Sequence, residues 1–310
     1  MLARYWDARY PRMSAILDGD ALQAAFAQPN PDGTFNDDVL AYLRDIGSRR
    51  SILLLAFAPK AAGTFFRQAA IHAIDGDLFR LSHAQGGRDA TPYLPNLIAL
   101  YLDDELPEIV VHAHMQAFTA NRHFLLALGI RPVIMLRNIP DMLASFWDML
   151  EVDAVARAEG LNCQVPSNFV EFSRAKKADF IVDEIAPWYV SYFATWKTFS
   201  DEMPNQVCVL RYGDFCEKPS KALHMALSHA GFFVSQSNCE AAISRVWSKR
   251  SLFRYNRGTE GRGRDYFSAR HFTELSRKLS HYPQLNSWES DLMHSGIESC
   301  DVQLIRHAAL

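Results

Sequence analysis

Short apolar runs alternate with longer segments of helical periodicity through most of this 310-residue chain. Runs rich in Ile, Leu and Val are typical of strands buried on both faces, and they predict strands at 52–57, 108–112, 131–137 and 207–212. Between these runs, apolar residues recur at helical spacing and predict helices at 65–74, 118–129, 140–158 and 218–232. Alternating strands and helices build parallel sheets whose right-handed crossovers cover both faces. The pattern therefore predicts an α/β fold with ligands bound beyond the carboxyl ends of the strands.

Outside this core the sequence is less regular but shows no linker and no repeat. Residues 1–48 have mixed helical patterns interrupted at 30–34 by NPDGT, which is typical of a turn. We expect them to form a helical extension packed on the core, with the irregular segments 150–205 and 232–290 folded against it. The sequence thus predicts one domain that spans residues 1–310.

Composition narrows the class of protein. With 49% hydrophobic and 22% charged residues the chain is typical of globular proteins, and a net charge of -3 argues against one that coats nucleic acid. No apolar run approaches the roughly 20 residues that span a bilayer, and the N-terminus lacks the apolar core of a signal peptide. The cysteines are scattered without CxxC spacing, which favours reduced thiols: Cys163, Cys208, Cys216, Cys239 and Cys300. Together these features predict a soluble, cytoplasmic protein.

The turn after the first predicted strand is the most informative segment. Residues 59–66, PKAAGTFF, place small residues and one lysine between a buried strand and a helix N-terminus. Converging backbone N–H groups and the helix dipole make such a turn an anion site, and small residues let a phosphate approach. In the P-loop of nucleoside-triphosphate enzymes the lysine follows the last glycine, whereas here Lys60 precedes Gly63 by three positions. The turn therefore predicts a phosphate cradle whose lysine arrives from the other side.

A second candidate follows the predicted strand at 131–137. In RNIPDMLASF, Asn138 can cap a helix that has Pro140 in its first turn. Arg137 and Ser145, two helical turns apart, can then close on one phosphate with a guanidinium fork and a hydroxyl. Taken alone, an arginine before a capped helix is more often part of a surface ion pair.

Together with two further segments, these motifs resemble a known family. PKAAGTFF resembles the 5′-phosphosulfate loop of the sulfotransferases that use 3′-phosphoadenosine 5′-phosphosulfate (PAPS), and RNIPDMLASF matches their 3′-phosphate motif RNxxDxxxS. RGTEGRGRDYF at 257–267 is similar to their RKGxxGDWKxxF segment, and RYGDFCEKPSKAL at 211–223 to their YEDMxxxPxxxI passage. The matches occur in order across 51–280, the family-like core. This resemblance to the cytosolic and bacterial sulfotransferase domain implies a P-loop-like three-layer α/β/α fold with a central, mainly parallel sheet.

The resemblance also implies which residues bind the donor. The 5′-phosphosulfate would contact the loop residues Lys60, Ala61, Ala62, Gly63, Thr64, Phe65 and Phe66. The 3′-phosphate would be held by Arg137, Ser145, Arg257 and Gly258. Lys60 would neutralise the leaving phosphate, and Ser145, which engages that lysine in the family, is counted with it as catalytic. Phe66 and Tyr212 stand where the family has aromatic residues near adenine, and core roles for both rings stay open.

The family's catalytic base also has a counterpart. The segment VVHAHMQ occupies the place of the family's KTHLP, which puts His114 at the histidine and His112 at the lysine. A hydroxyl acceptor must lose its proton as it attacks sulfur, and imidazole titrates near neutrality. We therefore expect His114 to act as base, with Glu105 or Glu108 as the alternatives. No metal is expected, because the acidic cluster at 103–105 lacks a matched ligand set.

Basic residues crowd one segment of this net-acidic chain: Arg245, Lys249, Arg250, Arg254, Arg257, Arg262 and Arg264. A doubly phosphorylated donor bound at Arg257 and Gly258 would account for this local excess of positive charge. Alternatively, Arg262 and Arg264 would bind an anionic acceptor. A solvated helix face gives the same pattern, and no nucleic-acid-binding motif accompanies it.

The sequence thus predicts a sulfotransferase that moves a sulfonate group from PAPS to a hydroxyl or amine by in-line transfer and releases adenosine 3′,5′-bisphosphate (PAP). The acceptor would be a small molecule, lipid or carbohydrate, and neither a nucleic-acid partner nor a membrane span is expected. Its pocket is expected near 80–105 and 150–200, beside aromatic residues that can equally be core: Trp147, Phe169, Phe172, Trp188, Tyr189 and Tyr192. Two alternatives stay open, an NTP-dependent phosphotransferase on a P-loop-like core and a PAP- or PAPS-binding module without catalysis.

Overall fold

The computed structural model describes residues 17–81, 92–152, 164–249 and 261–293. Its centre is an all-parallel sheet in the order β2-β3-β1-β4-β5, which confirms the predicted α/β fold. The strands are β1 (Ile52–Leu55), β2 (Gly76–Phe79), β3 (Glu108–His112), β4 (Val133–Leu136) and β5 (Cys208–Arg211). Because all of them run in the same direction, their carboxyl ends meet at one edge of the sheet.

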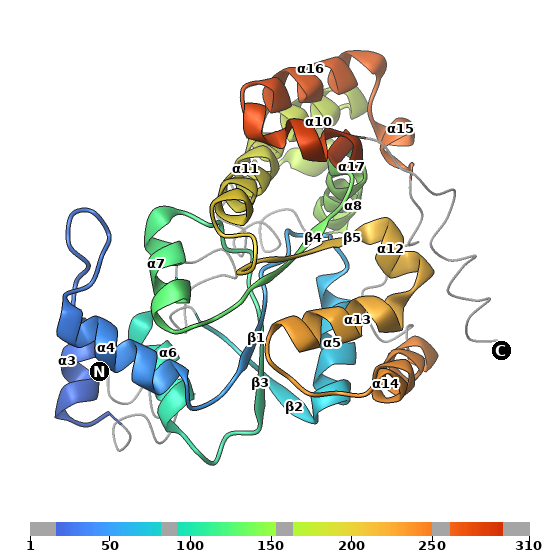
Figure 1. Ribbon diagram of the computed structural model, residues 1–310. Helices are drawn as coiled ribbons and strands as arrows, with labels where there is room; N and C mark the ends of the chain where they lie inside the picture. The colour runs from blue at the N-terminus through green and yellow to red at the C-terminus, as the bar shows by residue number, and fades with distance from the viewer. Residues whose placement is uncertain (1–16, 82–91, 153–163, 250–260, 294–310) are drawn as a thin grey trace.

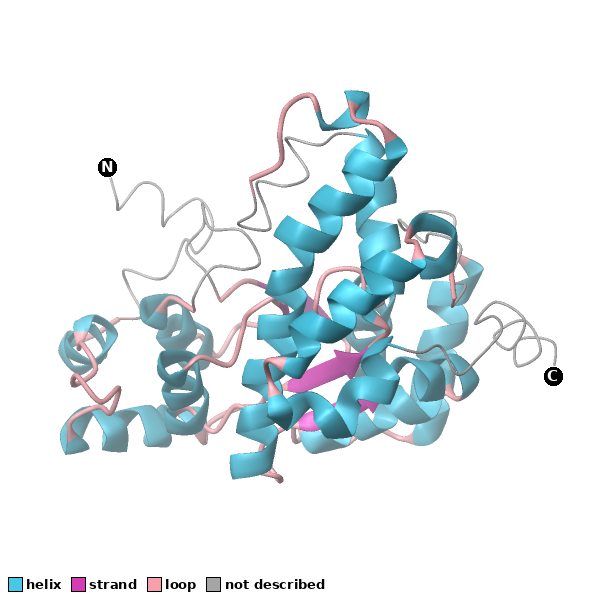
Figure 2. Cartoon of the chain, turned by 90° about the horizontal axis from the view of Figure 1, so that it is seen from above, coloured by secondary structure: helices cyan, strands magenta, loops and turns pink. Residues whose placement is uncertain are grey.

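Helices enclose the sheet in three groups (Figure 1). One face is covered by α5 (Gly63–Ile74), α12 (Tyr212–Glu217), α13 (Pro219–His229) and α14 (Gln236–Ser248). On the other side lie α3 (Gly19–Phe26), α4 (Asp37–Gly47), α6 (Leu94–Leu102) and α7 (Thr119–Ala127). Beyond the carboxyl edge stand α8 (Ile139–Val152), α10 (Arg174–Phe180), α11 (Ala186–Glu202), α15 (Gly263–Tyr266), α16 (Ala269–Ser280) and α17 (Glu289–Met293). The same part of the chain contains the 3-10 helices η2 (Phe169–Glu171) and η5 (Pro283–Trp288) and the π-helix η3 (Ile181–Ile185). Seen from above, the strands are surrounded by helices (Figure 2).

The predicted strands are all present, and only the edge strand β2 was not predicted. β2 has the sequence GDLF and exposes Asp77 and Leu78, so it lacks the continuous apolar run that identifies the inner strands. The predicted helices correspond to α5, α7, α8 and α13, although 153–158 of the third lie outside the described residues. The predicted turn at 30–34 is confirmed, with the Gly33 N–H donating to the Asn30 carbonyl at 2.7 Å.

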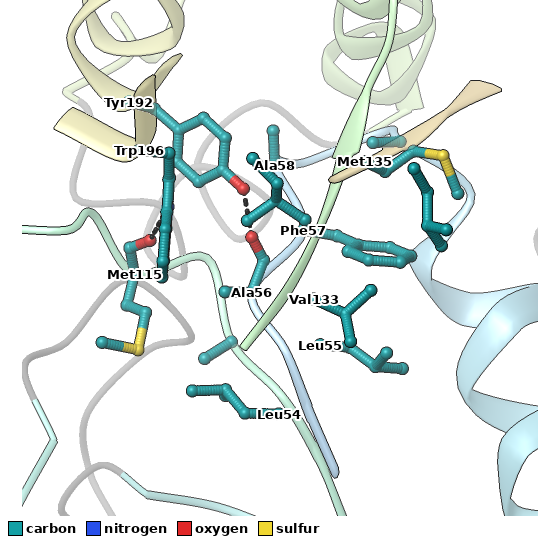
Figure 3. Packing of buried hydrophobic residues seen from close by; sticks show 14 of the residues in the cluster. Leu54, Leu55, Ala56, Phe57, Ala58, Met115, Val133, Met135, Tyr192 and Trp196 are labelled. Atoms are coloured by element: carbon teal, nitrogen blue, oxygen red, sulfur yellow. Dashed lines mark hydrogen bonds between the residues drawn. The ribbon is translucent and has the colours of Figure 1, made fainter. Parts of the chain in front are cut away.

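Helix α11 fixes the chain where β1 and β3 end. Its Tyr192 hydroxyl donates to the Ala56 carbonyl, and its Trp196 Nε1 donates to the Met115 carbonyl at 3.0 Å (Figure 3). Both side chains are fully buried, and burial raises the pKa of Tyr192 well above its usual value, so the hydroxyl keeps its proton. Because an unpaired carbonyl in the core is costly, these bonds hold the strand ends against the helix.

The structure bears on two sequence-based predictions, that the cysteines are reduced and that no segment spans a membrane. Cys208 and Cys239 are free and buried, and burial raises the pKa of each thiol to about 11. Cys216 is disulfide-bonded, so the prediction of reduced cysteines is wrong at this position, because spacing along the chain does not report which thiols meet in space. In the described part of the chain, no helix combines the length and apolarity needed to cross a membrane.

The hydrogen bond from Tyr192 of α11 to Ala56, which directly follows β1, gives a stability prediction. Tyr192→Phe should lower the free energy of unfolding by about 1–3 kcal/mol, because it leaves the buried Ala56 carbonyl without its donor. Tyr42→Phe is the control, since the Tyr42 hydroxyl makes no hydrogen bond to a described residue, and it should change stability by less than about 0.5 kcal/mol. Urea unfolding measures both variants, and equal effects would contradict the assignment.

Candidate functional site

The carboxyl edge of the sheet brings together four of the sequence-predicted residues. Lys60 follows β1, His114 follows β3, Arg137 follows β4, and Tyr212 follows β5 and begins α12. In parallel sheets this edge is where ligands bind, because strand ends and helix N-termini converge there. The segment from β1 to α5 lies at the centre of this group.

The β1–α5 loop has a strained backbone. Lys60 and Ala62 both adopt left-handed conformations, with φ of 66° and 62°. Such conformations cost an L-residue roughly 1–2 kcal/mol each, and they concentrate at functional sites. Ala62 caps α5 without a side-chain oxygen, so the N–H groups at the start of this helix point outward without an N-cap side chain. The Phe66 N–H is not one of these, because it donates to the Ala62 carbonyl at 3.1 Å.

His112 lies directly beneath the start of α5. A Cβ added to Gly63 would stand 2.3 Å from His112 Nε2, so only glycine lets the helix begin this close to the ring. The His112 and His114 rings meet edge to face with centroids 5.0 Å apart, and both residues are buried. The two histidines therefore pack under the loop as one unit.

Four side chains hold the backbone carbonyls of this loop. Tyr192 and Tyr189 of α11 donate to the carbonyls of Ala56 and Pro59, the second bond at 3.2 Å. His114 Nδ1 lies 2.7 Å from the Phe57 carbonyl, and Arg137 Nη1 donates to the Lys60 carbonyl at 2.5 Å. The donors come from α11, the end of β3 and the end of β4. The sequence places both tyrosines among the aromatic residues of an acceptor pocket or core, but it does not predict that they hold the loop, because the stripe that carries them is also typical of an ordinary core helix.

His114 has a defined tautomer in the neutral ring. A carbonyl oxygen only accepts, so Nδ1 must carry the proton that it donates to Phe57. The lone pair then belongs to Nε2, the atom that can take up a proton. The alternative bases lie elsewhere, because β3 begins at Glu108 and Glu105 precedes it, at the opposite edge of the sheet from His114.

Arg137 is a buried cation without a counter-charge. It is only 9% exposed, and no carboxylate among the described residues lies within ion-pair distance. Its guanidinium carbon lies 4.1 Å from the centroid of the Tyr212 ring, and its buried Nε has no hydrogen-bond partner. An uncompensated buried charge is costly, so this position favours an anion from outside the protein.

Helix α8 forms as its sequence predicts. The Asn138 side chain accepts the Asp141 N–H at 3.0 Å, which confirms the predicted cap. Ser145 lies two turns on and is buried, but it makes no hydrogen bond to Lys60 or to any other described residue. The structure therefore places Ser145 on the predicted helix without joining it to the loop.

The aromatic candidates lie mostly in the core. Phe66 is completely buried between Phe57 and Phe215, with ring centroids 5.3 and 5.6 Å away, so its ring belongs to the core in this structure. The Tyr212 ring faces the Arg137 guanidinium. Most of the aromatic residues expected near an acceptor are also buried, namely Trp147, Phe169, Tyr189 and Tyr192, whereas Phe172 and Trp188 are half-buried.

The basic segment is described only in part. Arg257 and Gly258 lie outside the described residues, as do Arg250 and Arg254. Arg262 is paired with Asp148 of α8 at 2.6 Å, and it lines a cavity of about 490 Å³ between α8, α10 and α15. Arg264 lies on α15. Among the described residues no three His, Cys, Asp or Glu side chains gather as a potential metal site.

The contact between Gly63 and His112 can be tested by stability. Gly63→Ala should lower the free energy of unfolding by about 1–3 kcal/mol, because the new methyl group overlaps the imidazole ring. In a His112→Ala background the same change should cost less than about 1 kcal/mol, since the obstructing ring is gone. Gly19→Ala, where no atom lies within 4 Å of the added Cβ, is the control. An unchanged cost in the double variant would refute this packing.

No protein-family model and no curated protein matches the chain. Among solved structures, the fold is similar to the crystal structure of mouse sulfotransferase SULT7A1 complexed with PAP. The TM-score is 0.55 at 12% sequence identity, and the match covers 82% of this chain and 92% of that chain. At this identity the likeness shows a shared fold.

Proposed function

We propose that this protein is a PAPS-dependent sulfotransferase whose donor binds at the β1–α5 loop. The observation that carries the proposal is Arg137, a buried guanidinium that has no carboxylate partner among the described residues and contacts the same loop through the Lys60 carbonyl. A phosphate group supplies the missing negative charge and accepts the fork of N–H donors. The shared fold with a PAP-bound sulfotransferase supports this reading.

Each end of the donor has a proposed partner. The outward N–H groups at the start of α5 would hold the 5′-phosphate, and Lys60 would neutralise charge on the leaving oxygen. Arg137 and Ser145 would bind the 3′-phosphate, together with Arg257 and Gly258 from outside the described residues. Tyr212 would act through Arg137, whose guanidinium it orients.

The transfer step follows from the tautomer of His114. The acceptor oxygen or nitrogen attacks sulfur in line, and the bond from sulfur to the phosphate oxygen breaks as PAP leaves, by analogy with phosphoryl transfer. His114 Nε2 takes the acceptor proton, because Nδ1 already donates to Phe57. The sulfonate group ends on the acceptor, which we propose to be a small molecule, lipid or carbohydrate with a hydroxyl or amine.

Arg137 offers a test in which stability and binding should respond differently. Arg137→Met keeps much of the volume, and the removal of an uncompensated buried charge offsets the lost bond to the Lys60 carbonyl, so the free energy of unfolding should change by less than about 1 kcal/mol. PAP affinity, measured by titration calorimetry, should fall at least about thirtyfold, because the phosphate loses its charged fork. A loss of several kcal/mol in stability with unchanged PAP binding would instead identify Arg137 as a structural residue.

His114 can be tested without disturbing the loop. His114→Asn keeps an N–H donor for the Phe57 carbonyl but has no basic nitrogen, so sulfonate transfer should fall by about 10²–10⁴-fold while PAP binding persists. The assay follows PAP release from PAPS across phenols, alcohols, amines and sugars, with ATP and Mg²⁺ as the parallel donor.

The outcomes of this assay separate the alternatives. Transfer with ATP but not with PAPS would identify a phosphotransferase. PAP binding without transfer to any acceptor would identify a binding module, and a His114→Asn variant as active as the wild type would exclude His114 as the base.

A further inference from the structure

Asp141 is a buried carboxylate whose two oxygens bind the backbone of a distant segment. It is 2% exposed, in the first turn of α8. Its Oδ2 accepts the Gly261 N–H at 2.8 Å, and its Oδ1 accepts the Gly263 N–H at 2.8 Å. No described cation pairs with it. Two N–H donors offset the cost of burying this charge, so Asp141 is committed to the segment 261–263.

The same segment also packs on the first turn of α8. A Cβ added to Gly263 would lie 2.4 Å from the Cβ of Pro140, so the chain approaches as closely as glycine allows. Pro140 and Asp141 thus both contact the segment. The turn that they form begins directly after Arg137 and Asn138.

This arrangement also explains why Arg137 pairs with no carboxylate in the described part of the chain. Asp141 is the buried carboxylate nearest to it in sequence, yet both of its oxygens are taken up by glycine N–H groups. The acid is therefore satisfied without neutralising the arginine. The positive charge of Arg137 stays available for an anion.

We propose that Asp141 is a positioning residue for the donor's 3′-phosphate. It holds the segment 261–263 against the turn that follows Arg137, so that this segment and Arg137 present one site to the phosphate. The inference rests on the proposed function. In this role Asp141 contributes to the protein's selectivity for a nucleotide that carries the 3′-phosphate, and it takes no part in proton transfer.

The test compares PAP with 5′-AMP, which lacks the 3′-phosphate. In titration calorimetry, Asp141→Asn should lower PAP affinity about tenfold, because its amide presents an N–H group to a glycine N–H. Affinity for 5′-AMP should stay within about twofold of the wild type, since the 5′-phosphate loop is untouched. A general structural defect would weaken both nucleotides alike.

A second variant reaches the same contact from the other side. Gly263→Ala keeps the carboxylate but pushes the segment off Pro140, and it should reduce the preference for PAP in the same way. Gly19→Ala on α3 and Asp179→Asn, whose carboxylate pairs with His271 of α16, are matched controls that leave the contacts of segment 261–263 in place, and both should keep the wild-type preference.

The possible results separate this inference from the proposed function. A wild-type protein that binds neither nucleotide overturns both proposals. A wild type that prefers PAP, with the preference intact in Asp141→Asn and Gly263→Ala, overturns the role of Asp141 alone. Equal weakening of PAP and 5′-AMP also overturns it.

Discussion

The candidate site depends on the side-chain hydrogen bonds that hold the carbonyls between β1 and α5. Tyr192, His114, Tyr189 and Arg137 donate to four carbonyls within a stretch of five residues, 56–60. Across a trans peptide the C=O of one residue and the N–H of the next point in opposite directions. Fixing the carbonyls toward the surrounding elements therefore fixes the orientation of the intervening N–H groups, and it sustains the left-handed residues at 60 and 62.

A second constraint concerns charge: the site contains a buried arginine and a buried carboxylate that do not pair with each other. Arg137 and Asp141 are both nearly inaccessible and only one helical turn apart in sequence. An ion pair between them would satisfy each side chain within the protein. Instead, the Asp141 carboxylate accepts two glycine N–H groups. Arg137 contacts the Tyr212 ring and donates to the Lys60 carbonyl. Such a cation is stabilised most when an anion arrives.

Much of this arrangement was predictable because it depends on local signals. An apolar run identifies an inner strand, and parallel strands bring their following residues to one edge, which is why Lys60, His114 and Arg137 converge. The supporting contacts were not predictable in the same way. Tyr192 and its carbonyl are 136 residues apart, and Asp141 and Gly261 are 120 apart. No periodicity or spacing rule relates positions so distant along a chain.

Phe66 shows a different limit of sequence reasoning. Its position in the motif matched an adenine-stacking residue, yet the same position on α5 also faces Phe57 and Phe215 in the core. A motif fixes the residue's place along the helix, whereas the partners on neighbouring elements decide whether the ring is accessible. Motif-based assignments are therefore stronger for backbone groups and strand-end charges than for aromatic side chains.

The bond from His114 to Phe57 joins the loop to the proposed chemistry. It restrains a carbonyl of the loop, and it also places the ring proton on Nδ1, which leaves Nε2 as the basic atom. One hydrogen bond thus contributes to the geometry of the loop and also sets the tautomer of the proposed base. A shift of the loop that broke this bond would remove the restraint on the Phe57 carbonyl and would also free the His114 ring to change its tautomer. The position of the loop and the protonation of His114 are therefore coupled through this backbone carbonyl.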